Sequence, residues 1–120
     1  MNLEEFIKTY IESVDELRAL LLFHANPDME WDNMRAAGKL YVPPAMMAVI
    51  LDRLTAKGFL TVAGDPPRYH FQSQTQELKQ MVEQLARLDA EKPVTLINMV
   101  YGRQKDVQAF ADAFKLKKQS

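Results

Sequence analysis

Most of the chain repeats its apolar residues at the three- and four-residue spacing of an amphipathic helix. This spacing predicts a short helix over residues 3–12, a second over 14–24 and a third over 29–37. Ser13 and Glu16 have the spacing of a capping box, in which the hydroxyl and the carboxylate each pair with a backbone amide of the other residue. The second helix is therefore expected to begin directly after Ser13.

The third helix is expected to begin after Asp28, to stop at a left-handed Gly38, and to turn Trp31 and Met34 toward the core. A fourth helix is predicted from Pro43 to Gly58, because proline suits a first helical turn and glycine suits a stop. Its buried side is expected to hold Met47, Ile50, Leu51 and Leu54.

After the fourth helix the apolar spacing changes from helical to alternating. "FLTVA" and "RYHFQ" alternate like strands and "GDPP" between them is turn chemistry, which predicts a β-hairpin over residues 59–72. A long amphipathic helix is expected over 75–90, followed by an apolar segment over 93–102 and a last helix around Phe110 and Phe114.

This order of elements predicts a mostly α fold with a two-stranded β-hairpin. Three helices followed by a hairpin form a winged helix-turn-helix, here with extra N- and C-terminal helices. We expect one domain over residues 1–120, with a winged-helix core at 13–72 and flanking helices at 1–12 and 73–120.

The stretch "ILDRLTAKGFLTVAGDPPRYHF" resembles the passage from recognition helix to wing in MarR-like bacterial transcription regulators. The resemblance covers about residues 14–72 and implies the winged-helix fold. The tail "VYGRQKDVQAFADAFKLKK" is similar to the end of a group of small proteobacterial winged-helix proteins that are regarded as regulators. This second resemblance implies a family and no mechanism.

Charge is distributed unevenly, although the net charge is only −1. Residues 1–33 are acidic, whereas residues 34–72 contain five Lys or Arg and two Asp. A surface that contacts DNA would have to be assembled in this mildly basic segment.

The outward side of the predicted recognition helix is poor in groups that read bases by hydrogen bonding. Its first half offers chiefly apolar contact, while affinity is expected to come from phosphates and to depend on salt. The candidate DNA-binding residues are Lys39, Pro44, Ala45, Met46, Ala48, Val49, Arg53, Lys57, Arg68 and His70. The function that follows is a DNA-binding transcriptional regulator that holds duplex DNA mostly through phosphate contacts.

The same apolar stretch supports an alternative function. An exposed "PPAMMAV" face is the kind of surface that another protein covers, so the chain could be a winged-helix protein-interaction module without DNA binding. A regulator that responds to a small ligand is a third alternative, and the sequence names no effector.

Other chemistry finds little support in the sequence. The chain has no cysteine and two separated histidines, so we expect no metal and no cofactor. It contains no glycine-rich phosphate loop and no nucleophile motif, so we do not expect an enzyme. The acidic start "MNLEEFIKTY" lacks the order of a signal peptide, and we expect a cytoplasmic protein.

The terminal helices carry more apolar surface than one small domain is expected to bury. We therefore predict a homodimer built from residues 1–12 and 75–115, without contact to a membrane. The candidate dimerisation residues are Leu78, Met81, Val82, Leu85, Leu88, Ile97, Val100, Phe110 and Phe114.

Overall fold

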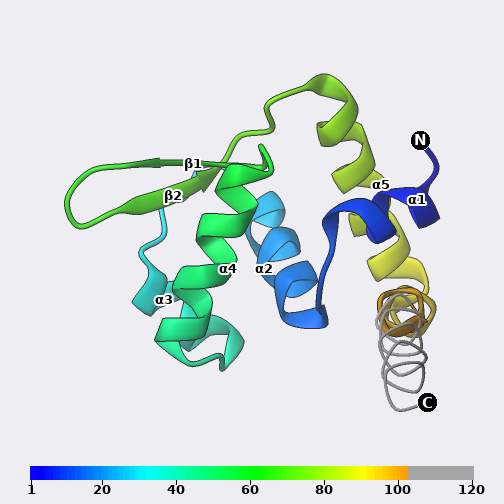
Figure 1. Ribbon diagram of the computed structural model, residues 1–120, viewed down its shortest axis with the longest axis horizontal. Coiled ribbons are helices and arrows are strands. Elements are labelled where there is room, and N and C mark those ends of the chain that lie inside the picture. The colour runs from blue at the N-terminus through cyan, green and yellow to red at the C-terminus, as the bar shows by residue number, and fades with distance from the viewer. Residues whose placement is uncertain (103–120) are drawn as a thin grey trace, which may run out of the picture.

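The computed structural model describes residues 1–102, and its helices and strands follow the predicted order (Figure 1). They are α1 (Leu3–Tyr10), α2 (Val14–Ala25), α3 (Asn33–Leu40), α4 (Pro44–Ala56), β1 (Leu60–Ala63), β2 (Arg68–Phe71) and α5 (Gln76–Glu91). The chain is helical again over residues 93–102. The predicted last helix, with Phe110 and Phe114, lies outside the described residues.

Side-chain caps fix the starts of the first two helices. Asn2 Oδ1 accepts a hydrogen bond of 2.8 Å from the amide of Glu5, and Ser13 Oγ accepts one of 3.1 Å from the amide of Glu16. Ser13 is thus the N-cap of α2, as predicted. The carboxylate half of the capping box is different, because Glu16 turns into the protein and binds Lys57.

The third helix begins four residues later than predicted, and its N-cap is Asp32 rather than Asp28. The residues before it are extended, because Trp31 pairs with Tyr69 of β2. The two residues exchange backbone hydrogen bonds of 2.8 Å in both directions. Pairing with a strand from a distant part of the chain therefore removes this segment from the helix that its local spacing predicted.

The end of α3 also differs from the prediction. Gly38 lies inside the helix, and Tyr41 takes the left-handed conformation with φ of 57°. Trp31 is buried as predicted, whereas Met34 is 63% exposed. Because Trp31 precedes the helix, the two residues do not share a helical face and the predicted pair is wrong.

The two strands form an antiparallel hairpin, which confirms the prediction for residues 59–72. Leu60 lies opposite Phe71 and Ala63 lies opposite Arg68, with the turn at residues 64–67. With α2, α3 and α4 directly before the hairpin, this is the topology of a winged helix-turn-helix, and α1 is an addition at its N-terminal side. The hairpin is the wing and α4 has the position of the recognition helix (Figure 1).

The predicted buried side of α4 is confirmed. The four side chains on that side are at most 4% exposed: Met47, Ile50, Leu51 and Leu54. The N-terminal helix is joined to the base of the wing through aromatic rings, because Phe6 and Tyr10 both lie edge-on to Phe59, at 5.8 and 5.6 Å between centroids.

The flanking helices lie at the other end of the molecule from the wing (Figure 1). α5 packs on α1 and α2, and its apolar stripe fills the space between them. None of the helices in residues 1–102 combines the length and the apolar character that crossing a membrane requires.

Candidate nucleic-acid interface

The outward side of α4 is apolar over the first half of the helix. Pro44 and Ala45 are exposed and Ala48 is partly buried, while Met46 and Val49 are 48% and 49% exposed. The helix begins without a side-chain cap because prolines occupy its first positions. This half of the helix therefore presents hydrocarbon and no side-chain hydrogen-bond donor.

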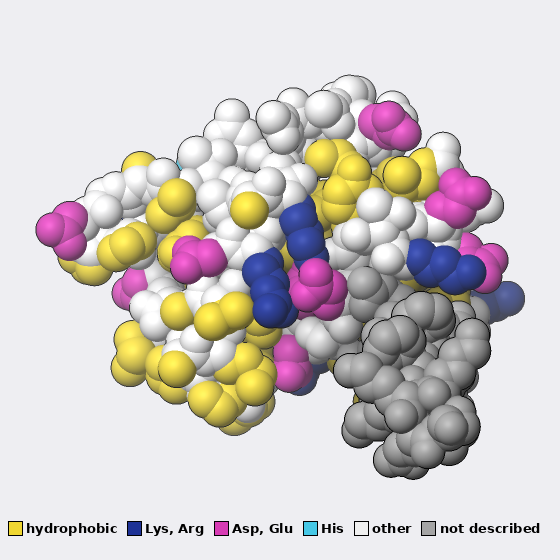
Figure 2. Space-filling model, viewed as in Figure 1, with side chains coloured by type: hydrophobic (Ala, Val, Ile, Leu, Met, Phe, Trp, Pro, Cys, Tyr) yellow, Lys and Arg dark blue, Asp and Glu magenta, His cyan; other side chains and the backbone are white. Residues whose placement is uncertain are grey.

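The apolar surface continues onto the turn that precedes α4. Tyr41 is 92% exposed, and Met34 of α3 is exposed as well. Figure 2 shows hydrophobic side chains gathered over this turn and over the N-terminal half of α4. Lys39, in the last turn of α3, is exposed and has no acidic partner within residues 1–102.

The basic side chains at the other end of α4 are paired with acids. Arg53 Nη1 lies 3.0 Å from Glu12 Oε2, and the guanidinium remains about half exposed. Lys57 is only 19% exposed, and its ammonium donates to the carbonyl oxygen of Tyr10 at 2.7 Å and binds the carboxylate of Glu16. Lys57 was predicted to contact phosphate, but its ammonium is bound within the chain by the Tyr10 carbonyl oxygen and by the carboxylates of Glu16 and Glu12, the latter at 3.6 Å.

Glu16 explains why Lys57 is held so closely. Its carboxylate is fully buried, and its second oxygen, Oε2, has no hydrogen-bond partner. Burial raises the pKa of this carboxyl above its ordinary value, and the hydrogen bond and charge of Lys57 oppose the rise. A buried carboxylate needs a cation beside it, and Lys57 is that cation.

The wing carries the remaining basic candidates. Arg68 is exposed and lies 3.7 Å from Glu30, an exposed pair of the kind that contributes little stability. His70 is partly buried, and its Nε2 lies 3.2 Å from the side-chain oxygen of Gln72. Asp65 stands in the turn of the wing, where its charge opposes phosphate.

One hydrogen bond joins the wing to α4. The hydroxyl of Tyr69 donates to Asp52 Oδ1 at 2.7 Å. Burial, together with this hydrogen bond and the nearby carboxylate charge, raises the pKa of Tyr69 to about 12. The hydroxyl therefore remains a hydrogen-bond donor well into the alkaline range, and its bond to Asp52 holds the wing against α4.

The candidate DNA-binding residues thus separate into three groups. The apolar residues of α4 lie together beside Lys39, at the N-terminal end of the helix. Arg68 and His70 lie on the wing, while Arg53 and Lys57 lie at the C-terminal end of α4 beside acidic side chains of the α1–α2 segment. The sequence did not reveal this acidic partner segment, because 41 positions separate Glu16 from Lys57.

The candidate dimerisation residues are less exposed than the sequence suggested. Four of them lie in the core of this chain, where a partner subunit cannot contact them: Met81, Val82, Leu85 and Val100. Three are partly buried: Leu78, Leu88 and Ile97. The apolar stripe of α5 is buried by α1 and α2 of the same chain, and Phe110 and Phe114 lie outside the described residues.

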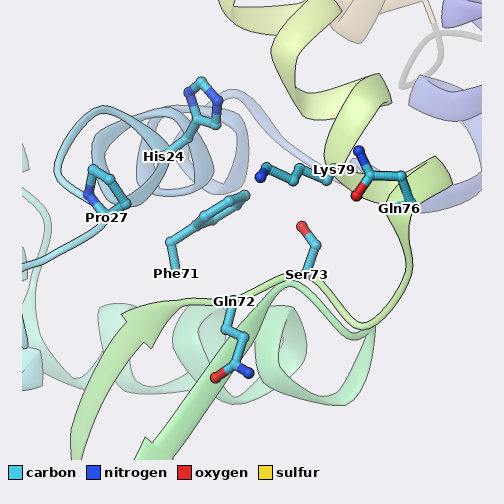
Figure 3. A pocket seen from close by; sticks show the side chains of 7 residues that line it. All are labelled: His24, Pro27, Phe71, Gln72, Ser73, Gln76 and Lys79. Atoms are coloured by element: carbon cyan, nitrogen blue, oxygen red, sulfur yellow. The ribbon is translucent and has the colours of Figure 1, made fainter.

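A hollow away from the outward side of α4 was not foreseen from the sequence (Figure 3). It has a volume of about 470 Å³ and is lined by His24, Pro27, Phe71, Gln72, Ser73, Gln76 and Lys79. The His24 and Phe71 rings meet edge-on at 5.3 Å, and the Ser73 hydroxyl has no hydrogen-bond partner in the described part of the chain. Since three separate segments contribute these residues, no local motif could have indicated the hollow.

No family model matches the chain, and a search of curated proteins finds no match. Solved structures are similar in fold. MepR from Staphylococcus aureus, described as a transcription regulator of the multidrug efflux pump MepA, aligns with a TM-score of 0.58 and 14% identity over 98% of this chain and 86% of its own. PefR from Streptococcus agalactiae, described as a heme sensor protein, aligns with a TM-score of 0.57 and 12% identity over 92% of this chain and 80% of its own.

A third similar structure is ZitR from Lactococcus lactis, with a TM-score of 0.53 and 14% identity over 88% of this chain and 74% of its own. At these identities the similarity shows the fold alone. The chain therefore has the winged helix-turn-helix fold with added N- and C-terminal helices.

Proposed function

We propose that this protein is a transcriptional regulator of winged-helix, MarR-like type that binds duplex DNA through α4 and the wing. The observation that carries the proposal is that the outward side of α4 is left uncovered while its inward side is fully packed. The flanking helices α1 and α5 lie at the other end of the molecule from the wing (Figure 1). Met46 and Val49 on the outward side of α4 are each about half exposed, which supports access of DNA to this helix.

Affinity in this proposal comes from phosphate contacts. Lys39 beside the start of α4 and Arg68 on the wing are the exposed cations that flank the helix, with Arg53 as a third after exchange of its acidic partner. Three contacts are few, so binding is weak and sensitive to salt.

A homodimer completes the proposal, because a twofold axis would present two copies of α4 to successive major grooves on one side of DNA. Exposed apolar side chains that suit a subunit interface are Val94 and Tyr101, which lie in the helical segment 93–102. Light scattering at micromolar concentration tests this, and a monomer at every concentration would contradict it. Such a regulator would work in the cytoplasm, where its DNA is.

Titration of duplex DNA at about 50 mM and about 200 mM salt tests the proposed function. We expect Lys39→Ala and Arg68→Ala each to weaken binding and to reduce the slope of log K against log salt by about 1. Arg87→Ala is the matched control. It removes the same single positive charge, but from an exposed position on α5, away from the proposed interface. Absence of binding at the lower salt concentration would overturn the proposal.

The second candidate, a protein-interaction module, has one observation in its favour. Three of the predicted DNA-binding cations, Arg53, Lys57 and Arg68, are paired with acids. The surface that remains around Tyr41, Met46 and Val49 is apolar. No binding of DNA at low salt, together with a purified partner whose binding Met46→Glu abolishes, would favour this second function.

A further inference from the structure

The first half of α4 cannot read bases by hydrogen bonding. Its outward side chains are Pro44, Ala45, Met46, Ala48 and Val49, and none of them carries a donor or an acceptor suited to a base edge. The recognition helix of a helix-turn-helix protein contacts base edges with its N-terminal residues, so the part of α4 that enters the groove is the apolar part.

The polar side chains of the second half are already engaged. Asp52 accepts the hydrogen bond of Tyr69, and Arg53 is paired with Glu12 at 3.0 Å. Using either one to read a base would require that an existing contact be broken. The outward surface of α4 can therefore contact base pairs only through van der Waals contact of its apolar side chains, unless one of these existing contacts is broken.

One group on the floor of the major groove suits such a surface. The 5-methyl group of thymine is apolar, whereas the remaining major-groove positions that distinguish the base pairs are hydrogen-bond donors or acceptors. Met46 and Val49 stand three residues apart on the same side of α4, and each is about half exposed. Together with Ala45 they form a continuous ridge that can cover methyl groups of neighbouring base pairs.

We propose that α4 discriminates among DNA sequences through van der Waals contact of Ala45, Met46 and Val49 with thymine 5-methyl groups, a readout that rests on the proposed function. Phosphate contacts by Lys39 and Arg68 hold the protein on the duplex, and the methyl contacts set its preference. Each methyl group that the ridge covers strengthens binding about fourfold, which is the usual effect of burying one carbon of this size.

The test compares two duplexes that differ only in this methyl group. One is an alternating adenine–thymine duplex, in which every register offers thymine methyls, and the other replaces each thymine with deoxyuridine. Both are titrated at about 50 mM salt by fluorescence anisotropy. We expect the deoxyuridine duplex to bind more weakly by about 16-fold if two methyl groups are covered, at about fourfold for each.

Substitutions in α4 test whether the difference in affinity comes from the ridge. In the double variant Met46→Ala, Val49→Ala we expect the thymine and deoxyuridine duplexes to bind with more nearly equal affinity, because the ridge is truncated. Both positions are exposed, so folding should be little affected. Lys39→Ala is the matched control, because it should weaken both duplexes by the same factor and leave their ratio unchanged.

The failures are distinguishable. Equal affinity for the two duplexes, with the salt dependence retained, would overturn the methyl readout and leave the proposed function intact. A thymine preference that persists in the double variant would also overturn it, because the preference would then come from DNA shape rather than from the ridge. Absence of any binding at low salt would contradict the proposed function itself.

Discussion

Lys57, at the end of α4, binds the fully buried carboxylate of Glu16, in the first turn of α2. The same ammonium donates to the carbonyl oxygen of Tyr10 and lies 3.6 Å from Glu12, so it joins the α1–α2 connection to the end of α4. A cation expected on the DNA-facing surface is therefore mostly buried, with its ammonium bound to acidic and carbonyl oxygens of the same chain.

The first prediction concerns stability. Lys57→Met leaves the Glu16 carboxylate buried without its cation, and we expect the free energy of unfolding to fall by about 3–5 kcal/mol. Urea denaturation at neutral pH measures this. Lys39→Met is the matched control, because Lys39 is exposed and should change stability by no more than about 0.5 kcal/mol. Equal effects of the two substitutions would contradict a structural role for Lys57.

The second prediction concerns pH. Burial raises the pKa of Glu16, so the folded chain binds this proton more readily than the unfolded chain does. Such a group contributes stability that is fully present below the ordinary carboxyl pKa and is lost as the pH rises through the folded-state pKa. We therefore expect the free energy of unfolding of the wild type to fall relative to that of Glu16→Gln as the pH rises from about 4 toward neutrality.

Urea denaturation of the wild type and Glu16→Gln at several pH values checks the sign. A difference between the two proteins that does not change with pH would mean that the carboxyl titrates alike in the folded and unfolded chains. A difference that changes in the opposite direction would mean that Lys57 outweighs burial.

Patterns that depend on local spacing were reliable guides to the fold. The buried side of α4 was predicted correctly because Met47, Ile50, Leu51 and Leu54 repeat at helical spacing. Contacts between distant segments were not predictable in this way. The start of α3 was misplaced because Trp31 pairs with Tyr69, and the Lys57 contact was missed because a local motif assigned Glu16 to a helix cap.

Two glycines, Gly38 and Gly58, also show that local sequence does not determine where a helix ends. Both Gly38 and Gly58 were predicted to stop a helix, but only Gly58 has a positive φ, of 92°. A Cβ added at Gly58 would lie 2.6 Å from Gln74 Oε1, whereas one added at Gly38 would have nothing within 4 Å.

The third prediction is that the same substitution has opposite effects at these positions. Gly38→Ala should stabilise the protein by about 0.5–1 kcal/mol, because alanine is the better helix former and space is free. Gly58→Ala should destabilise it by more than about 1 kcal/mol, because the conformation disfavours a side chain and Gln74 is in the way. Thermal unfolding of the two variants measures both signs, and a shift in the same direction would contradict the assignment.

The fourth prediction tests whether the ion pair with Glu12 reduces the ability of Arg53 to bind a DNA phosphate. Glu12 Oε2 lies 3.0 Å from Arg53 Nη1, and both side chains are partly exposed, so the pair can exchange with a phosphate. In Glu12→Gln the guanidinium loses this carboxylate and a negative charge leaves the edge of the proposed interface. We expect DNA affinity at low salt to rise several-fold, with a slope of log K against log salt that is steeper by about 1.

Glu4→Gln is the control for this fourth prediction, because it makes the same change of charge on α1, where Glu4 is exposed and lies 3.9 Å from Lys8. Charges farther apart than about 10 Å are largely screened in ordinary buffer. We therefore expect Glu4→Gln to leave the DNA affinity nearly unchanged. An equal gain in both variants would mean that net charge alone governs binding. No gain in Glu12→Gln would mean that Arg53 does not reach the phosphates, and the contact surface would then be limited to Lys39, the wing and the apolar first half of α4.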